Sequence, residues 1–155
     1  MKRFFFLFAL MALPAFAQQL DFGGMQQDPN APVEVVADQL GVNQTDGSAT
    51  FTGNVLISQG EMRLSAAKVV VVYTEETSDI QSMKASGGVT LLNGPEAAEA
   101  AEADYTIESG MIIMRGNVLV TQGANTVSAD RMTVNLTTGM AQMEGRVRTV
   151  LGGQN

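Results

Sequence analysis

Cysteine, histidine and tryptophan are all absent from this chain of 155 residues. The lack of cysteine excludes disulfides, thiolate metal sites and thiol nucleophiles. The lack of histidine removes the commonest general base and the commonest metal ligand. Without tryptophan, the aromatic platforms expected of a sugar-binding face are missing as well. We therefore expect no catalytic residues, no metal site and no cofactor, and a fold held together by its core alone.

Positive charge is also scarce, with 9 Lys and Arg against 16 Asp and Glu, a formal net charge of −7. Nucleic-acid binding depends on clustered Lys and Arg, so the acidic balance argues against a nucleic-acid partner. The length suits one domain rather than two.

The first 17 residues, MKRFFFLFALMALPAFA, have the layout of a secretory signal peptide cleaved before Gln18. Their apolar run, 4–13, is shorter than the roughly 20 residues that a membrane-spanning helix needs. A retained membrane anchor is the alternative. Cleavage would leave 155 − 17 = 138 residues, with a net charge of 7 − 16 = −9. We expect residues 18–32 to be a flexible lead-in and residues 33–151 to form the folded domain.

A repeat runs through that domain. GNVLISQG at 53–60 returns as GNVLVTQG at 116–123, and nine of the nineteen residues from Gly53 to Val71 are identical after a shift of 63. Two looser copies centre on Gly87 and Gly145. A second unit precedes each glycine, at 37–42, 66–71, 102–107 and 129–134. Repeats of about 30 residues predict stacked supersecondary units that bury their apolar faces only against one another.

The residues two and four positions from each central glycine form an apolar stripe with period two. Fifteen of these sixteen are apolar, whereas the interleaved positions are mostly polar, which predicts antiparallel strands with one dry face. The fold class is therefore all-β. The sixteen positions are Ala49, Phe51, Val55, Ile57, Met83, Ala85, Val89, Leu91, Ile112, Met114, Val118, Val120, Ala141, Met143, Val147 and Thr149.

Two local features stay open from the sequence. PEAAEAAEAD at 95–104 has helical composition, but the repeat predicts a strand at 101–107, so 95–100 is helix, strand or loop. The four glycines predict a sheet that bends at one level. The alternative is that their missing side chains leave a lane, meaning a continuous space for a ligand, along the inner face.

The apolar stripe is in the first place a hydrophobic core, but its composition also fits a ligand groove. It is aliphatic and rich in methionine, which adapts to irregular apolar guests such as acyl chains. The candidate lipid-groove residues are Phe51, Val55, Ile57, Met83, Val89, Leu91, Ile112, Met114, Val118, Val120, Met132, Met143 and Val147.

The repeated pattern, Ala-Asp followed by Gly-Asn-Val at this spacing, resembles the OstA-like family of lipopolysaccharide transport proteins over residues 33–150. The nearest match is EADYTIESGMIIMRGNVLVTQGANTVSADRMTVNL at 102–136. The resemblance implies a twisted, V-shaped β-jelly roll, open at both ends, that carries lipopolysaccharide acyl chains across the periplasm. It also implies head-to-tail contact with further copies and with the jelly-roll domains of inner-membrane LptC-like and outer-membrane LptD-like partners.

The charges at the two ends of the domain suggest how copies would meet. Glu34 and Asp38 lie in the first strand, about 33–42, and Arg146 and Arg148 in the last, about 140–150. Exposed sheet edges pair readily with other chains. Opposite charges would favour pairing of the first strand with the last strand of another copy. The alternative is that the charges only keep the edges soluble.

Three rival interpretations remain from the sequence. A carboxylate enzyme is disfavoured because Asp38 and Asp130 occupy equivalent repeat positions, which indicates a structural role. A ligand-free β-repeat stalk would have a solidly packed interior rather than an open groove. A membrane-anchored LptC-like protein follows if residues 1–17 are retained.

Arg115, Arg131 and Lys68 are candidates to meet headgroup phosphates at a groove mouth.

Overall fold

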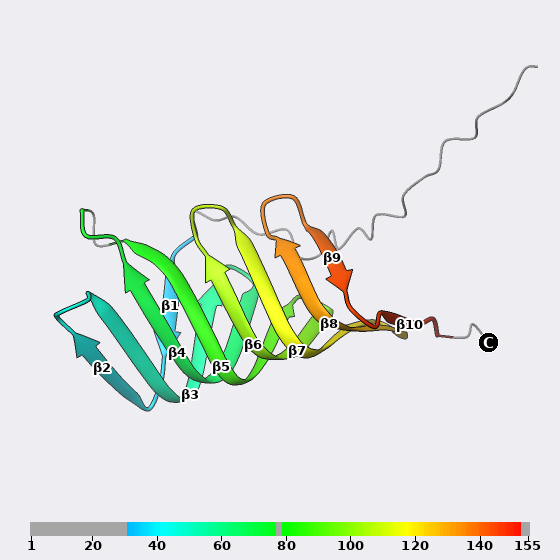
Figure 1. The fold of residues 1–155 in the computed structure, drawn as a ribbon, viewed down its shortest axis with the longest axis horizontal. Helices are drawn as coiled ribbons and strands as arrows, with labels where there is room; N and C mark the ends of the chain where they lie inside the picture. The colour runs from blue at the N-terminus through cyan, green and yellow to red at the C-terminus, as the bar shows by residue number, and fades with distance from the viewer. Residues whose placement is uncertain (1–30, 77–78, 153–155) are drawn as a thin grey trace, which may run out of the picture.

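The computed structural model describes residues 31–76 and 79–152, which form ten antiparallel strands with no helix between them (Figure 1). The all-β prediction is confirmed. The predicted signal peptide and nearly all of the predicted lead-in lie outside the described residues. The strands are β1 Val33–Val36, β2 Gln39–Asn43, β3 Ser48–Gln59, β4 Met62–Tyr73, β5 Ile80–Asn93, β6 Glu96–Thr106, β7 Met111–Gln122, β8 Asn125–Asn135, β9 Met140–Glu144 and β10 Arg148–Val150.

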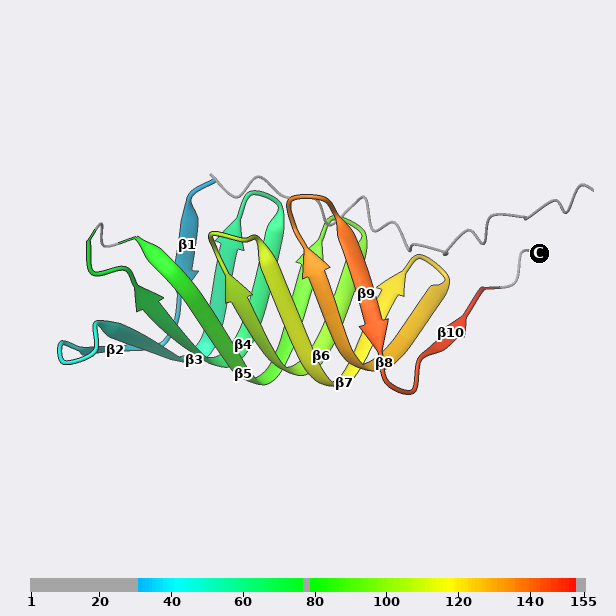
Figure 2. The ribbon, with the colours of Figure 1, turned by 45° about the horizontal axis from the view of Figure 1, so that its top comes forward.

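All ten strands belong to one sheet, in which strands β3 to β8 follow in chain order and each pairs with the next (Figure 2). We call each strand position in the sheet a layer. The first and the last layer each consist of two short strands. Strands β1 and β2 both pair with β3, and strands β9 and β10 both pair with β8. The predictions of single strands at about 33–42 and 140–150 were therefore wrong in detail. The sheet thus has eight layers, two of which are split at the level where the others bend.

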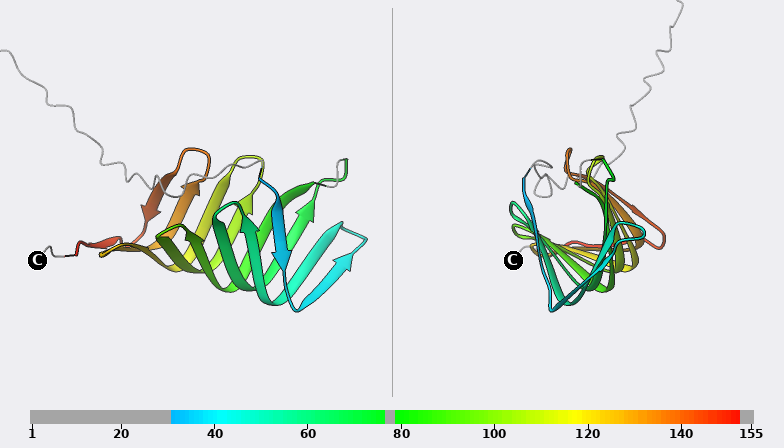
Figure 3. Two further views of the ribbon diagram at one scale, coloured as in Figure 1. Left: turned by 180° about the vertical axis from the view of Figure 1, so that it is seen from behind. Right: turned by 90° about the vertical axis from the view of Figure 1, so that its left-hand side faces the viewer.

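The sheet folds along a line that crosses every layer, so its two halves form the walls of a V (Figure 3). We call the half that contains β1 and β10 the first wall, and the half that contains β2 and β9 the second wall. The first wall also holds 55–59, 62–66, 89–93, 96–100, 118–122 and 125–129, and the second holds 48–52, 68–73, 80–86, 102–106, 111–115 and 131–135. The inner faces of the two walls carry the apolar stripe.

The central glycines make the fold line. At each layer, the pairing register shifts by one residue, as in β3 and β4 between the pairs Thr52–Lys68 and Val55–Ala66. Such a bulge bends and twists a sheet. Gly116 has a φ of +84° and is followed by Asn117 at +49°. Only glycine adopts the first of these angles without strain. The predicted bend is confirmed.

The missing Cβ atoms at the fold line leave no lane for a ligand. A Cβ on Gly87 would lie 2.7 Å from the Cβ of Ala67, and one on Gly116 would lie 2.7 Å from the Cβ of Ala101. At the ends, Asp38 fills the same place beside Gly53, and Asp130 beside Gly145. The interpretation of the glycines as a cleared lane was therefore wrong, because neighbouring side chains occupy the space.

The fold line also corrects the alignment of the third repeat. Ala101 lies opposite Gly116 as Asp130 lies opposite Gly145, so the second unit of that repeat starts at Ala100 rather than Glu102. Residues 95–100, left open from the sequence, join strand β6 from Glu96 onward. Tertiary pairing with β5 and β7 overrides the helical propensity of the alanine-rich segment.

Candidate functional site

The structure gathers most of the predicted groove residues on one continuous inner face. Ten of the thirteen are buried, at no more than 4% exposure, and nine of those ten come from β3, β5 and β7. The ten are Val55, Ile57, Met83, Val89, Leu91, Ile112, Met114, Val118, Val120 and Met132. Phe51 and Met143 are partly buried and pack against this cluster.

Val147 does not lie on the buried inner face, where the period-two pattern predicted it. It belongs to the link between β9 and β10 and is 51% exposed. It occupies the same position relative to Gly145 as the buried Val118 does relative to Gly116. Among the described residues, no strand lies beyond β9 and β10 to cover it. The prediction of a buried strand position was wrong for this residue.

The interior is closed in this structure. One cluster of buried apolar side chains spans both walls, for example Val55 and Val118 of the first wall with Val69 and Ile112 of the second. Burial of one acyl methylene contributes about 0.8 kcal/mol to binding. In this structure, however, protein side chains already fill the space in which an acyl chain would be buried. An acyl chain would therefore enter only as the walls move apart.

The two open ends of the V contrast with this closed centre. Leu40 and Val42 of β2 pair with Phe51 and Ala49, so they lie on the inner face, yet they are 58% and 67% exposed. Side chains paired directly across a ladder share one face. At the opposite end, Val147 and Leu151 are also exposed. The apolar stripe thus continues to both edges of the sheet without a cover.

A hydrogen bond joins the two walls across the rim of the V. The Tyr105 hydroxyl of the second wall donates to Oε1 of Gln59 on the first wall, at 3.0 Å. Gln59 also donates from Nε2 to the Ala31 carbonyl at 3.1 Å. Burial raises the pKa of the Tyr105 phenol above its ordinary value of 10.0. This bond holds the walls together near the open side.

The Tyr105 pKa predicts a loss of stability in alkali. Above pH 10 the phenol ionises in the unfolded chain while it stays protonated in the folded one. The unfolded state then binds fewer protons, and the free energy of unfolding falls as the pH rises towards the folded pKa. We expect urea unfolding between pH 9 and 11.5 to show this fall. Tyr105→Phe should flatten it and cost about 1–2 kcal/mol at pH 8 through the lost hydrogen bond. An unchanged slope in the variant would contradict the assignment.

A row of polar side chains follows Gln59 along the rim of the first wall. Asn93 pairs with Glu96 in the next hairpin, and Glu96 pairs with Gln122. Gln122 donates from Nε2 to Oε1 of Glu96 at 2.8 Å. Gln59, Asn93 and Glu96 are all buried. We call Gln59, Asn93, Glu96 and Gln122 the rim row.

The sequence contained a signal for this row that the period count missed. Gln59, Asn93 and Gln122 each stand six residues after a central glycine and just before a turn glycine. Counting to the sixth position would have placed all three on the dry face. The period had been counted only to the fourth position, where the stripe is apolar.

The basic residues do not line a groove mouth. Lys68, Arg115 and Arg131 lie in one row on the outer face beside the fold line, in register with Ser86, Glu102 and Glu144. Arg115 forms an ion pair with Asp104. These three candidates for phosphate contact therefore do not lie at a groove mouth.

Two of the four end charges, Asp38 and Arg146, have side-chain partners within the chain. Arg146 donates to Asp130 at 2.7 Å, and this contact holds the pKa of the Asp130 carboxyl below its usual value. The Asn54 side chain donates to Asp38 at 3.0 Å. The two aspartates thus stabilise the fold line at the terminal layers, which confirms the structural role predicted from their equivalence.

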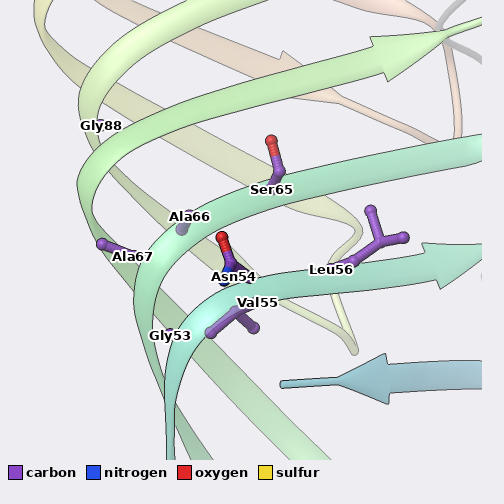
Figure 4. Close-up of a pocket in the computed structure, with 8 residues that line it drawn as sticks. All are labelled: Gly53, Asn54, Val55, Leu56, Ser65, Ala66, Ala67 and Gly88. Carbon is purple, nitrogen blue, oxygen red and sulfur yellow. The ribbon is translucent and has the colours of Figure 1, made fainter. Parts of the chain in front are cut away.

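An open hollow of about 530 Å³ lies at the fold line across β3, β4 and β5 (Figure 4). Its lining includes the backbone of Gly53 and Gly88 and the outward side chains of Leu56 and Ser65. The hollow carries no charged side chain. The described residues contain no group of three or more acidic side chains placed to hold a metal ion.

Fold and site together define a class: an open, V-shaped β-jelly roll with an apolar interior that continues to both ends. Residues 34–140 match the family described as LptA/(LptD N-terminal domain) LPS transport protein, where LPS is lipopolysaccharide. The chain belongs to this family.

Known relatives agree with that assignment. The chain is 28% identical over 160 residues to the uncharacterized protein R00383 of Rhizobium meliloti, covering 95% of this chain and 86% of that one. It is 27% identical over 128 residues to the lipopolysaccharide export system protein LptA of Escherichia coli K12, covering 79% of this chain and 65% of LptA.

A solved structure shares the fold. The crystal structure of LptH from Pseudomonas aeruginosa, an LptA-homologous periplasmic component of lipopolysaccharide transport, superposes with a TM-score of 0.73 at 16% identity. The match covers 82% of this chain and 99% of LptH. In the part of the chain that the structure describes, no helix is long and apolar enough to span a membrane.

Proposed function

We propose that this chain is a periplasmic lipopolysaccharide transport protein that carries acyl chains between its two walls and bridges the inner and outer membranes in head-to-tail stacks. The observation that carries the proposal is the apolar stripe, which is continuous on the inner face and uncovered at both ends. Membership of the LptA family supports it. No enzymatic step is part of this function.

The register inside the chain supports a specific head-to-tail contact. Within the chain, the residue two positions before a central glycine pairs with the same repeat position of the next strand. The pairs are Phe51 with Val69, Ala85 with Ala103 and Met114 with Met132. The sheet has an even number of layers, so a second copy would continue the antiparallel alternation. The same offset pairs Met143 with Leu40 of the next copy.

The continued register would cover the exposed apolar residues at the ends. It places Ala141 opposite Val42, Val147 opposite Ala37 and Leu151 opposite Val33 of the next copy. Arg148 would stand opposite Val36 and diagonal to Glu34, so opposite charges would meet. Asp38 and Arg146 already have partners within the chain, so Glu34 and Arg148 carry the electrostatic part of the proposal.

The same edges would accept other jelly-roll ends. One end would pair with an inner-membrane LptC-like domain and the other with an outer-membrane LptD-like domain. The LPS-assembly protein LptD of Yersinia pseudotuberculosis is 30% identical to this chain over 118 residues, which cover 69% of this chain and 14% of that protein. A likeness between the two jelly rolls supports pairing of equivalent edges.

Comparing intact with deacylated lipopolysaccharide tests the lipid part. The inner face holds no basic side chain among the described residues, so acyl chains rather than phosphates should supply the affinity. Calorimetric titration should show binding of intact lipopolysaccharide and at least a hundredfold weaker binding of the fully deacylated form, since each buried methylene adds about 0.8 kcal/mol. Equal binding of both forms would show headgroup recognition instead. Binding of neither would favour the ligand-free stalk.

A further inference from the structure

The rim row differs in chemistry from every other part of the inner face. The inner face is apolar from the fold line to the fourth residue beyond Gly53, Gly87 and Gly116. Beyond that level lies the rim row, of which Gln59, Asn93 and Glu96 are buried. These three are the buried polar or charged residues among the described part of the chain. They lie at the turn ends of their strands, so the row marks the height at which the apolar interior stops.

One group in the row has an unmet hydrogen bond. Nδ2 of Asn93 is buried, with the residue 3% exposed, and it has no acceptor among the described residues. A buried donor without a partner costs about 1–3 kcal/mol. Buried donors without a partner are uncommon in protein interiors, and each calls for an explanation such as a bound ligand, ion or water.

We propose that the rim row binds the uncharged hydrogen-bonding groups, amide, ester or hydroxyl, that join acyl chains to the headgroup of an acylated glycolipid. This inference rests on the proposed function and adds the substrate chemistry at the rim. Asn93 donates to a carbonyl or hydroxyl oxygen of the lipid. The Glu96 carboxyl accepts from a hydroxyl or amide hydrogen.

The composition of the row decides between uncharged groups and phosphates. Phosphate sites use Arg or Lys, which supply charge-assisted hydrogen bonds. The rim row contains neither, and an ionised Glu96 would repel a phosphate. Arg63, the basic residue that follows Met62 in β4, stands on the outer face opposite Leu92 and donates to the Gly60 carbonyl at 2.7 Å. Phosphates of the same lipid would therefore stay above the rim, in solvent.

The Gln59–Tyr105 hydrogen bond gives the site its closed state. Tyr105 fills the acceptor of Gln59 while the walls are together. When the walls part, Gln59 loses that donor. A lipid hydroxyl or amide can then replace it, so ligand entry exchanges one hydrogen bond of Gln59 for another.

Asn93→Leu tests the proposal, with Met62→Leu as its matched control. Met62 pairs with both Gln59 and Asn93 in the same row and is equally buried, but it has no strong hydrogen-bonding group. The probes are purified lipopolysaccharide and diphenylhexatriene, an apolar dye without hydrogen-bonding groups. Asn93→Leu should bind lipopolysaccharide about tenfold more weakly and the dye unchanged. Met62→Leu should bind both as the wild type does.

Three results would overturn the inference. Lipopolysaccharide affinity of Asn93→Leu equal to that of the wild type would show that the row makes no contact. Equal loss of both probes would show general damage to the interior. A wild type that binds the dye but not lipopolysaccharide would reject the proposed function itself. If Asn93→Leu does not fold, Asn93→Ala has the same expected selective loss, and Asn93→Gln should retain affinity within about threefold.

Discussion

Replacing Gly116 with alanine should lower the free energy of unfolding by about 2–4 kcal/mol. Alanine at a φ of +84° costs about 1–2 kcal/mol. Its Cβ would also lie 2.7 Å from that of Ala101, both methyl groups being attached directly to the backbone. Overpacking of this kind adds about 1–3 kcal/mol. Urea unfolding monitored by circular dichroism measures the change.

Gly123→Ala is the matched control. Gly123 also has positive φ, +59°, but a Cβ there would meet no atom within 4 Å. We expect a loss of about 1 kcal/mol from strain alone. The double change Ala101→Gly with Gly116→Ala should recover part of the loss, because it removes the contact but not the strain. Equal effects of the two single alanine changes would refute the close-packed fold line.

Leu40→Glu should abolish head-to-tail oligomers while leaving the monomer folded. Leu40 is 58% exposed, so the change disturbs little in the monomer. In the proposed contact it meets Met143 of another copy, where a buried, unpaired carboxylate would cost several kcal/mol. Sedimentation velocity at increasing concentration should show oligomers for the wild type and monomers for the variant.

Leu92→Glu provides the control for that experiment. Leu92 is 43% exposed and lies on the outer face of β5, away from both ends. The same change of side chain there should leave oligomers intact. Loss of oligomers in both variants would indicate a general effect of added negative charge. Oligomers unaffected by Leu40→Glu would exclude the proposed register.

The period-two pattern was enough to predict the strands and most of the inner face. It placed Val118 and Met114 correctly because alternation survives across the glycine in β3, β5 and β7. In the companion strands β4, β6 and β8 the alternation breaks at the fold line, and in β8 the inward positions skip from Ala129 to Met132. A bulge on the neighbouring strand causes that skip, and no local pattern signals it, so the third repeat was misaligned.

The ends and the rim were harder to predict for physical reasons. Val147 satisfies the pattern, but its burial depends on a neighbouring strand that the described residues do not supply. The partners of Arg146 and Asp38 depend on side chains sixteen residues away in the sequence. The Tyr105–Gln59 bond joins residues 46 apart across two walls. Only the three-dimensional bend brings them together.

Photo-crosslinking at Val118 tests the central claim most directly, with Asn117 as the neighbouring control. Val118 is buried on the inner face of β7, and Asn117 is exposed at the fold line. The protein carrying a photoreactive residue at one of these positions is mixed with lipopolysaccharide and irradiated. A lipid adduct at 118 and none at 117 is the predicted result. Adducts at neither position in a well-folded protein, or at 117 alone, would contradict carriage of acyl chains between the walls.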